Sequence, residues 1–138
     1  MRGNWIHHQK MGGVWVYKGA GGIFEDNDIF ANAKAAVRVY EYGNPTVSAN
    51  RIYGGRGAGV LVYEFGRGSF CDNDIYDNRG WNVEIRRNCA PTFERNKVHG
   101  GHPGGFYCHG DGDEGDEGYC LPTLDHNEIY ANEGKLVN

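Results

Sequence analysis

The sequence has no long apolar run. Its longest unbroken stretches of apolar residues, such as Val14 to Tyr17, contain four residues, whereas a membrane-spanning helix needs about 20. The residues that follow Met1 contain no apolar block of the kind that marks a secretory signal. These absences predict a protein that is not inserted in a membrane and that resides in the cytoplasm.

Positive charge and cysteine are also scarce. The chain carries 14 Lys and Arg against 18 Asp and Glu, so it lacks the excess of cations that draws a protein to a phosphate backbone, and no nucleic-acid partner is expected. Four cysteines in 138 residues are too few for a disulfide-dense scaffold. A chain of this length can form one hydrophobic core without covalent links, so a single domain, residues 1–138, with free thiols is the first expectation.

What the sequence does contain is a repeat. An Asn recurs every 23 residues and is followed two positions later by Ile or Val, and we name this set of residues the Asn column. The last spacing is 31, and the surplus of eight equals an acidic insertion at residues 111–118, so the register survives. The column consists of Asn4, Asn27, Asn50, Asn73, Asn96 and Asn127.

Apolar residues recur at fixed offsets inside each unit, and near the middle of the unit they alternate with other residues at period two, which is the period of a strand. The position ten residues after each Asn is occupied by Val14, Val37, Val60, Val83, Phe106 and Val137. The position twenty residues after it is occupied by Phe24, Val47, Phe70 and Phe93. Strands this short cannot bury a face alone, but a chain that coils once per repeat stacks each strand on its equivalent. We therefore predict an all-β fold, a right-handed parallel β-helix of about six coils with three short parallel sheets. The Asn column is expected at a turn with left-handed backbone, where its side-chain amides bond coil to coil.

Several motifs resemble a known family. Residues 50–56 (Asn-Arg-Ile-Tyr-Gly-Gly-Arg), 59–63, 66–68 and 72–76 resemble the β-helix repeats of F-box-only ubiquitin-ligase substrate receptors. In those receptors the β-helix holds a protein substrate, so the resemblance implies a non-catalytic scaffold or protein-recognition module. The F-box and the cysteine-rich zinc domain are not in this sequence, so ligase recruitment is not carried over.

The coil pattern is also similar, more loosely, to carbohydrate-active β-helix proteins such as pectin lyases, polygalacturonases and alginate epimerases. That likeness implies the alternative function, a polysaccharide-binding or polysaccharide-modifying β-helix. Fold likeness does not transfer chemistry, and the catalytic elements of those enzymes are absent. We therefore expect no enzymatic activity and no cofactor.

Four carboxylates flank two turns of the Asn column and form a candidate catalytic set. They are Asp26, Asp28, Asp72 and Asp74. Their separation of two coils, roughly 10 Å, is near the upper end of the range for inverting glycosidases. Aspartate is also common at turns for backbone reasons, and Arg51 of the intervening coil is expected between the two pairs.

Two outward aromatic stripes are the predicted binding residues. One contains Tyr17, Tyr40 and Tyr63, and the other contains Phe30, Tyr53 and Tyr76, with His7, His99 and Tyr130 in the same column. Exposed rings supply contact area for a protein partner or stack on sugars. The alternative is an intramolecular ladder that stabilises coil on coil.

The acidic insertion offers oxygen ligands for a cation, with Asp111, Asp113 and Asp116 as a weak metal candidate. The alternative is a solvated loop or partner contact, and no other metal site is expected.

The cysteines allow one disulfide. Cys89 and Cys120 are equivalent in neighbouring coils once the insertion is removed, which puts their Cα atoms within bridging reach, about 5 Å. Cys108 falls in an inward column and is expected to be a core residue, and Cys71 flanks an Asn turn.

Neither end of the sequence contains an amphipathic helix that would cover the last strands. Exposed strand edges invite further pairing, so other protein chains are expected at the open ends or along the aromatic stripes.

Overall fold

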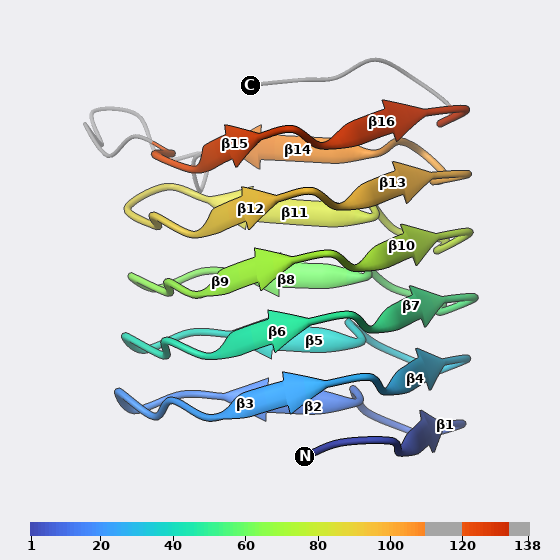
Figure 1. Ribbon diagram of the computed structural model, residues 1–138, viewed down its shortest axis with the longest axis horizontal. Coiled ribbons are helices and arrows are strands. Elements are labelled where there is room, and N and C mark those ends of the chain that lie inside the picture. The colour runs from blue at the N-terminus through green and yellow to red at the C-terminus, as the bar shows by residue number, and fades with distance from the viewer. Residues whose placement is uncertain (110–119, 133–138) are drawn as a thin grey trace.

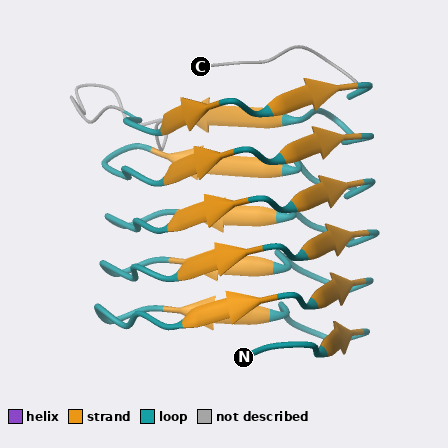
Figure 2. Ribbon diagram, viewed as in Figure 1, coloured by secondary structure: helices purple, strands orange, loops and turns teal. Residues whose placement is uncertain are grey.

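The computed structural model describes residues 1–109 and 120–132, and these form a solenoid of short parallel strands stacked coil on coil (Figure 1). The described residues contain strands and loops and no helix, so none that could cross a bilayer (Figure 2). The all-β prediction is confirmed.

Among the described residues, five coils each contribute one strand to each of three parallel sheets, and a sixth coil adds one strand to the first of them. The six-stranded sheet contains β1 (Trp5–His7), β4 (Asp28–Phe30), β7 (Arg51–Tyr53), β10 (Asp74–Tyr76), β13 (Lys97–His99) and β16 (Glu128–Tyr130). The sheet that we name the Val sheet contains β2 (Val14–Val16), β5 (Val37–Val39), β8 (Val60–Val62), β11 (Val83–Arg86) and β14 (Phe106–His109). The third, the Phe sheet, contains β3 (Ile23–Glu25), β6 (Thr46–Ser48), β9 (Ser69–Cys71), β12 (Thr92–Glu94) and β15 (Thr123–Asp125).

The register of these sheets is the register of the sequence repeat. Ile29 pairs with Ile52, and Ile52 with Ile75, and all three side chains are fully buried. The predicted inward columns are confirmed in the interior coils, where Val37, Val60 and their equivalents form the core. Leu124 in β15 continues the Phe column, but it is 42% exposed because β15 is the last strand of its sheet.

The strand length follows from this geometry. In the six-stranded sheet the middle residue of each interior strand is buried and its neighbours point outward, whereas the Val sheet buries the first and third residues. Three residues are therefore enough to place one or two side chains in the core before the chain must turn. The Phe column adds ring stacking inside, with the centroids of Phe70 and Phe93 4.6 Å apart.

The Asn column forms the predicted ladder between coils. The side-chain amide nitrogen of Asn50 donates to Asn73 Oδ1 at 3.1 Å, and Asn73 donates in the same way to Asn96 at 3.0 Å. Each Oδ1 also accepts the backbone N–H of the Asn one coil earlier, as between Asn50 and Asn73 at 2.9 Å. These interior asparagines are buried with both ends of the amide bonded.

The expected left-handed backbone at the Asn column is wrong by one position. The residues with positive φ come directly before the asparagines, as at Asp26 (54°), Ala49 (53°) and Asp72 (55°). The turn is made before the Asn, so that the Asn backbone N–H and side chain both face the next coil.

A second set of asparagines, which includes Asn32 and Asn78, occurs in alternate coils. Asn32 Oδ1 accepts the backbone N–H of Gln9 at 3.1 Å, and Asn78 Oδ1 accepts that of Gly55 at 3.0 Å. The intervening coil has glycine at this turn. A Cβ added to Gly59 would lie 2.8 Å from Asn78 Nδ2 and 2.6 Å from a backbone oxygen of the next coil. Each Asn therefore needs a small residue in the coil before it.

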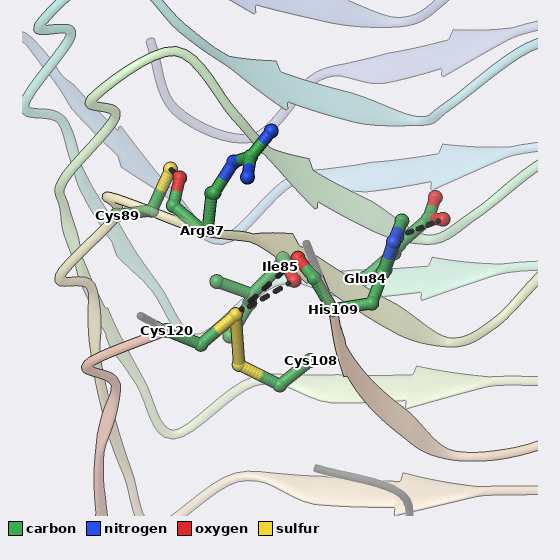
Figure 3. The surroundings of a disulfide bond; sticks show 7 residues. All are labelled: Glu84, Ile85, Arg87, Cys89, Cys108, His109 and Cys120. Atoms are coloured by element: carbon green, nitrogen blue, oxygen red, sulfur yellow. Dashed lines mark hydrogen bonds and ion pairs between the residues drawn. A yellow bond between two sulfur atoms is a disulfide. The ribbon is translucent and has the colours of Figure 1, made fainter. Parts of the chain in front are cut away.

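The cysteine expectations are corrected. The disulfide joins Cys108 to Cys120, with Cα atoms 6.0 Å apart (Figure 3), so neither the expectation of unlinked thiols nor a Cys89–Cys120 bridge is right. Cys120 does follow the backbone of Cys89, because the N–H of Leu121 donates to Cys89 O at 3.0 Å. Its side chain is directed to Cys108 of the same coil, whereas the Cys89 Sγ lies 3.5 Å from Arg87 O.

Candidate functional site

The outward face of the six-stranded sheet carries two columns of side chains, because the first and third residues of each strand point away from the core. One column is aromatic and consists of His7, Phe30, Tyr53, Tyr76, His99 and Tyr130. Neighbouring rings are stacked with centroids 4.7 to 5.1 Å apart and planes within 7° of parallel. The intramolecular ladder is therefore present.

This stacking limits what the ladder can bind. Tyr53 is covered on one ring face by Phe30 and on the other by Tyr76, so its edge and hydroxyl are what it presents to solvent. The rings point outward as expected, but in the interior of this stripe Phe30, Tyr53 and Tyr76 are half-buried by their own neighbours, and their use in binding stays a prediction. Tyr130, on the last described strand of its sheet, is 47% exposed.

The second column of this face begins with Trp5 and continues with charged residues. Their charges alternate between negative and positive in the order Asp28, Arg51, Asp74, Lys97 and Glu128. Arg51 binds Asp28 through two bonds, Nε to Oδ1 at 2.8 Å and Nη2 to Oδ2 at 3.0 Å. The hydrogen bonds from Arg51 lower the pKa of Asp28 below its ordinary value. The carboxylates of Asp28 and Asp26 in turn raise the pKa of Arg51.

Arg51 lies between Asp28 and Asp74 in this column, as expected, but it does not bridge the two carboxylate pairs. It binds Asp26 and Asp28 of the preceding coil, while Asp74 lies 2.7 Å from His99 Nε2.

Asp72 is bound by Arg95 through two oxygens at 3.0 and 3.2 Å, and those bonds lower the pKa of Asp72. A general acid in a glycosidase needs a raised pKa. The pairing therefore favours a structural role for these carboxylates, and the absence of catalysis stays a prediction.

A hollow of about 200 Å³ lies at the first coils of this face, lined by Trp5, Asp28, Phe30 and Tyr53. Trp5 is 75% exposed. The sequence reasoning missed Trp5, although it holds the outward position that Asp28 and Arg51 hold in the next two coils.

The other predicted stripe follows the strands of the Val sheet. The ring centroids of Tyr17 and Tyr40 are 5.1 Å apart and those of Tyr40 and Tyr63 are 4.9 Å apart. Burial is the main cause that raises the pKa of Tyr40, with its two tyrosine neighbours adding to it. The guanidinium of Arg86 lies 5.5 Å from the Tyr63 ring and extends the column by one coil.

Two aromatic residues beside this stripe were not predicted. Tyr42 and Phe65 are stacked with centroids 5.1 Å apart, and they are 57% and 47% exposed. We use the name turn patch for Tyr17, Tyr40, Tyr42, Tyr63 and Phe65. The turn patch combines a half-buried ladder with two exposed rings on the adjoining turn.

The backbone at these two residues is unusual for their type. Tyr42 and Phe65 both have φ of 63°, a left-handed conformation that costs a residue with a Cβ about 1–2 kcal/mol. The same turn position holds Gly19 at 69° in the first coil and Asn88 at 63° in the fourth, and these are the residues that normally adopt it. Large aromatics replace them only in the second and third coils, where they form the exposed pair.

No metal centre is found in the part of the chain that the structure describes, where three or more His, Cys, Asp or Glu side chains never gather as a metal-binding group. The weak candidate at Asp111, Asp113 and Asp116 lies outside the described residues.

A family model described as right handed beta helix region matches residues 1–129. Comparison with curated proteins and with solved structures gave no match. Three parallel sheets, a period of 23 residues and a family match over almost the whole sequence agree with one another, and the chain belongs to the right-handed β-helix family.

Proposed function

We propose that this β-helix is a non-catalytic recognition module that binds a protein partner through the turn patch. The observation that carries the proposal is the pair Tyr42 and Phe65, which are exposed and stacked at positions where other coils have Gly19 and Asn88. Strained residues that the fold does not require are concentrated at functional sites. Rigid exposed aromatics are also the residue type that dominates binding energy at protein interfaces.

The right-handed β-helix family includes both scaffolds and enzymes, so the family match favours neither function. The resemblance of residues 50–76 to the repeats of F-box-only receptors agrees with protein recognition, and the neutralised carboxylates agree with the absence of catalysis.

The test uses the double variant Tyr42→Asn/Phe65→Asn. Asparagine accepts the left-handed backbone, as Asn88 does, so the variant relieves strain while it loses one ring stack, and its stability should stay within about 1 kcal/mol of the parent. The immobilised full chain, the double variant and a control, Trp5→Ala, are compared as baits by quantitative mass spectrometry.

A protein partner is expected to be retained by the parent and by Trp5→Ala and to lose at least about tenfold in affinity on the double variant. Partners that bind all three baits equally, or a double variant that unfolds at a clearly lower urea concentration, would refute the assignment to the turn patch.

The second candidate function is polysaccharide binding at the hollow beside Trp5. The specific observation in its favour is one exposed indole next to the hydrogen-bonding groups of the Asp28–Arg51 pair. Titration with neutral and uronic-acid oligosaccharides tests it. Saturable binding by the parent that is lost in Trp5→Ala and kept in the Tyr42→Asn/Phe65→Asn variant would establish this function in place of the first.

A further inference from the structure

A stack of turns with a positive charge excess joins the six-stranded sheet to the Val sheet. It comprises residues 8–13, 31–36, 54–59, 77–82 and 100–105. These turns contain the cations Lys10, Lys34, Arg56 and Arg79, and Asp77 is their single carboxylate. The chain as a whole has more acidic than basic residues, 18 against 14, so the sign of this edge opposes that of the molecule.

The stack contains a hollow of about 270 Å³. It is lined by the basic or titratable side chains of His8, Lys10 and Arg56, together with Gln9, Ala31, Ala33 and Gly54. The hollow exists because the residue between Lys10 and Arg56 in the column is Ala33, whose side chain is short. A Cβ placed on Gly54 would meet no atom within 4 Å, so the space above that turn is open as well.

Among the described residues, the two cations at this hollow have no acidic partner. Arg51 and Arg95 are each held by carboxylates, whereas within residues 1–109 and 120–132 neither Lys10 nor Arg56 forms a salt bridge. The lining itself contains no carboxylate. Asp77 holds the column position one coil beyond Gly54, so the positive end of the hollow is the part between Lys10 and Arg56.

We propose that this hollow binds a phosphate or sulfate monoester of a small molecule. Lys10 and Arg56 are two coils apart, roughly 10 Å along the stack, which leaves a tetrahedral oxyanion within reach of both. A guanidinium binds such an anion through two parallel hydrogen bonds, and an ammonium adds a point charge. This inference is independent of the protein partner proposed for the turn patch, which lies on a different turn.

The size of the hollow is the reason for a monoester. A volume of about 270 Å³ corresponds to roughly nine water molecules at liquid density, which is more than one inorganic anion fills. Ala31 and Ala33 provide apolar lining for the carbon skeleton, and Gln9, whose Nε2 donates to His7 O at 3.1 Å, adds a polar side chain to the same lining.

The test is an NMR titration of the ¹⁵N-labelled full chain with glucose 6-phosphate, glucose 6-sulfate, inorganic phosphate and glucose. The two esters are expected to bind saturably with Kd near or below about 1 mM at low salt. Shift changes are expected at residues 8–10, 31–33 and 54–56. Inorganic phosphate should bind more weakly and glucose not at all.

Three variants make the result specific. Arg56→Gln should weaken ester binding by about tenfold or more, because a hydrogen bond to a charged group is lost. Ala33→Glu should abolish binding, because it places a negative charge in the lining between Lys10 and Arg56. Arg67→Gln, an exposed arginine of the same coil outside the hollow, is the matched control and should leave Kd unchanged.

Three results would overturn the proposal. They are the absence of saturation up to about 20 mM ester, equal affinity of Arg56→Gln and the parent, and shift changes spread evenly over all cationic surfaces. Equal affinity for inorganic phosphate and the phosphate ester would overturn the assignment of a monoester.

Discussion

Replacing Asn73 by alanine tests whether the Asn ladder holds the coils together. Asn73 is 2% exposed and its side chain makes four hydrogen bonds. Its Nδ2 donates to Asn96 Oδ1 at 3.0 Å and to Val47 O at 2.9 Å. Its Oδ1 accepts the backbone N–H of Asn50 at 2.9 Å and the Asn50 side-chain amide at 3.1 Å.

The variant removes all four bonds and leaves buried partners on both neighbouring coils without them. With about 1 kcal/mol net for each bond, the four bonds together lead us to expect a loss of about 3–5 kcal/mol in the free energy of unfolding. In urea, with a slope of about 2 kcal/mol/M, this shifts the unfolding midpoint down by about 2 M.

The chain provides a matched control in the same column. Asn4 is exposed, and its side-chain amide donates to Asn27 Oδ1 at 3.0 Å and to Arg2 O at 3.1 Å. Because water can replace the hydrogen bonds that Asn4→Ala removes, the loss in the free energy of unfolding should be about 1 kcal/mol or less. Urea unfolding followed by tryptophan fluorescence and by circular dichroism measures both variants. If the two differ by less than about 0.5 kcal/mol, with equal slopes, the ladder is not what stabilises the stack.

Two further predictions concern a salt bridge and the cysteines. Because Arg51 lowers the pKa of Asp28, the stabilisation from this pair is present above the ordinary carboxyl pKa and is lost as the pH falls through the lowered one. Both side chains are partly exposed, so Arg51→Gln should cost about 1 kcal/mol or less at pH 7 and less at acidic pH, as measured by urea unfolding. An equal cost at neutral and acidic pH would contradict the assignment. Peptide mapping without reductant should recover Cys108 linked to Cys120, and a fragment that links Cys89 to Cys120 instead would show that this pairing is wrong.

The sequence was sufficient to predict the coil and its register. A period of 23 residues fixes which side chains lie above one another, so the burial of Ile29, Ile52 and Ile75 and the amide ladder followed from spacing alone. The left-handed turn position did not, because the residues that occupy it, such as Asp26 and Ala49, share no side-chain type. A conformation held by the neighbouring hydrogen bonds leaves no trace in composition.

The disulfide was missed for a related reason. Repeat spacing compares positions one above another, and it correctly placed the backbone of Cys120 beside that of Cys89. The bridge to Cys108 runs between two positions of one coil, and their distance depends on how the chain returns around the core. Such bridges are typical of oxidising compartments, so its formation would argue against the expected cytoplasmic location.

The positions that carry function in a solenoid are those where the repeat is broken. Residues that recur in every coil, such as the Asn ladder and the Ile column, are explained by coil-to-coil bonding and need no ligand. Tyr42 and Phe65 stand where other coils have glycine or asparagine. A short Ala33 between Lys10 and Arg56 opens a hollow with charged walls. Selection for coil stacking alone would have filled these positions like their equivalents, so variants at the exceptions should change binding while variants of the ladder change stability.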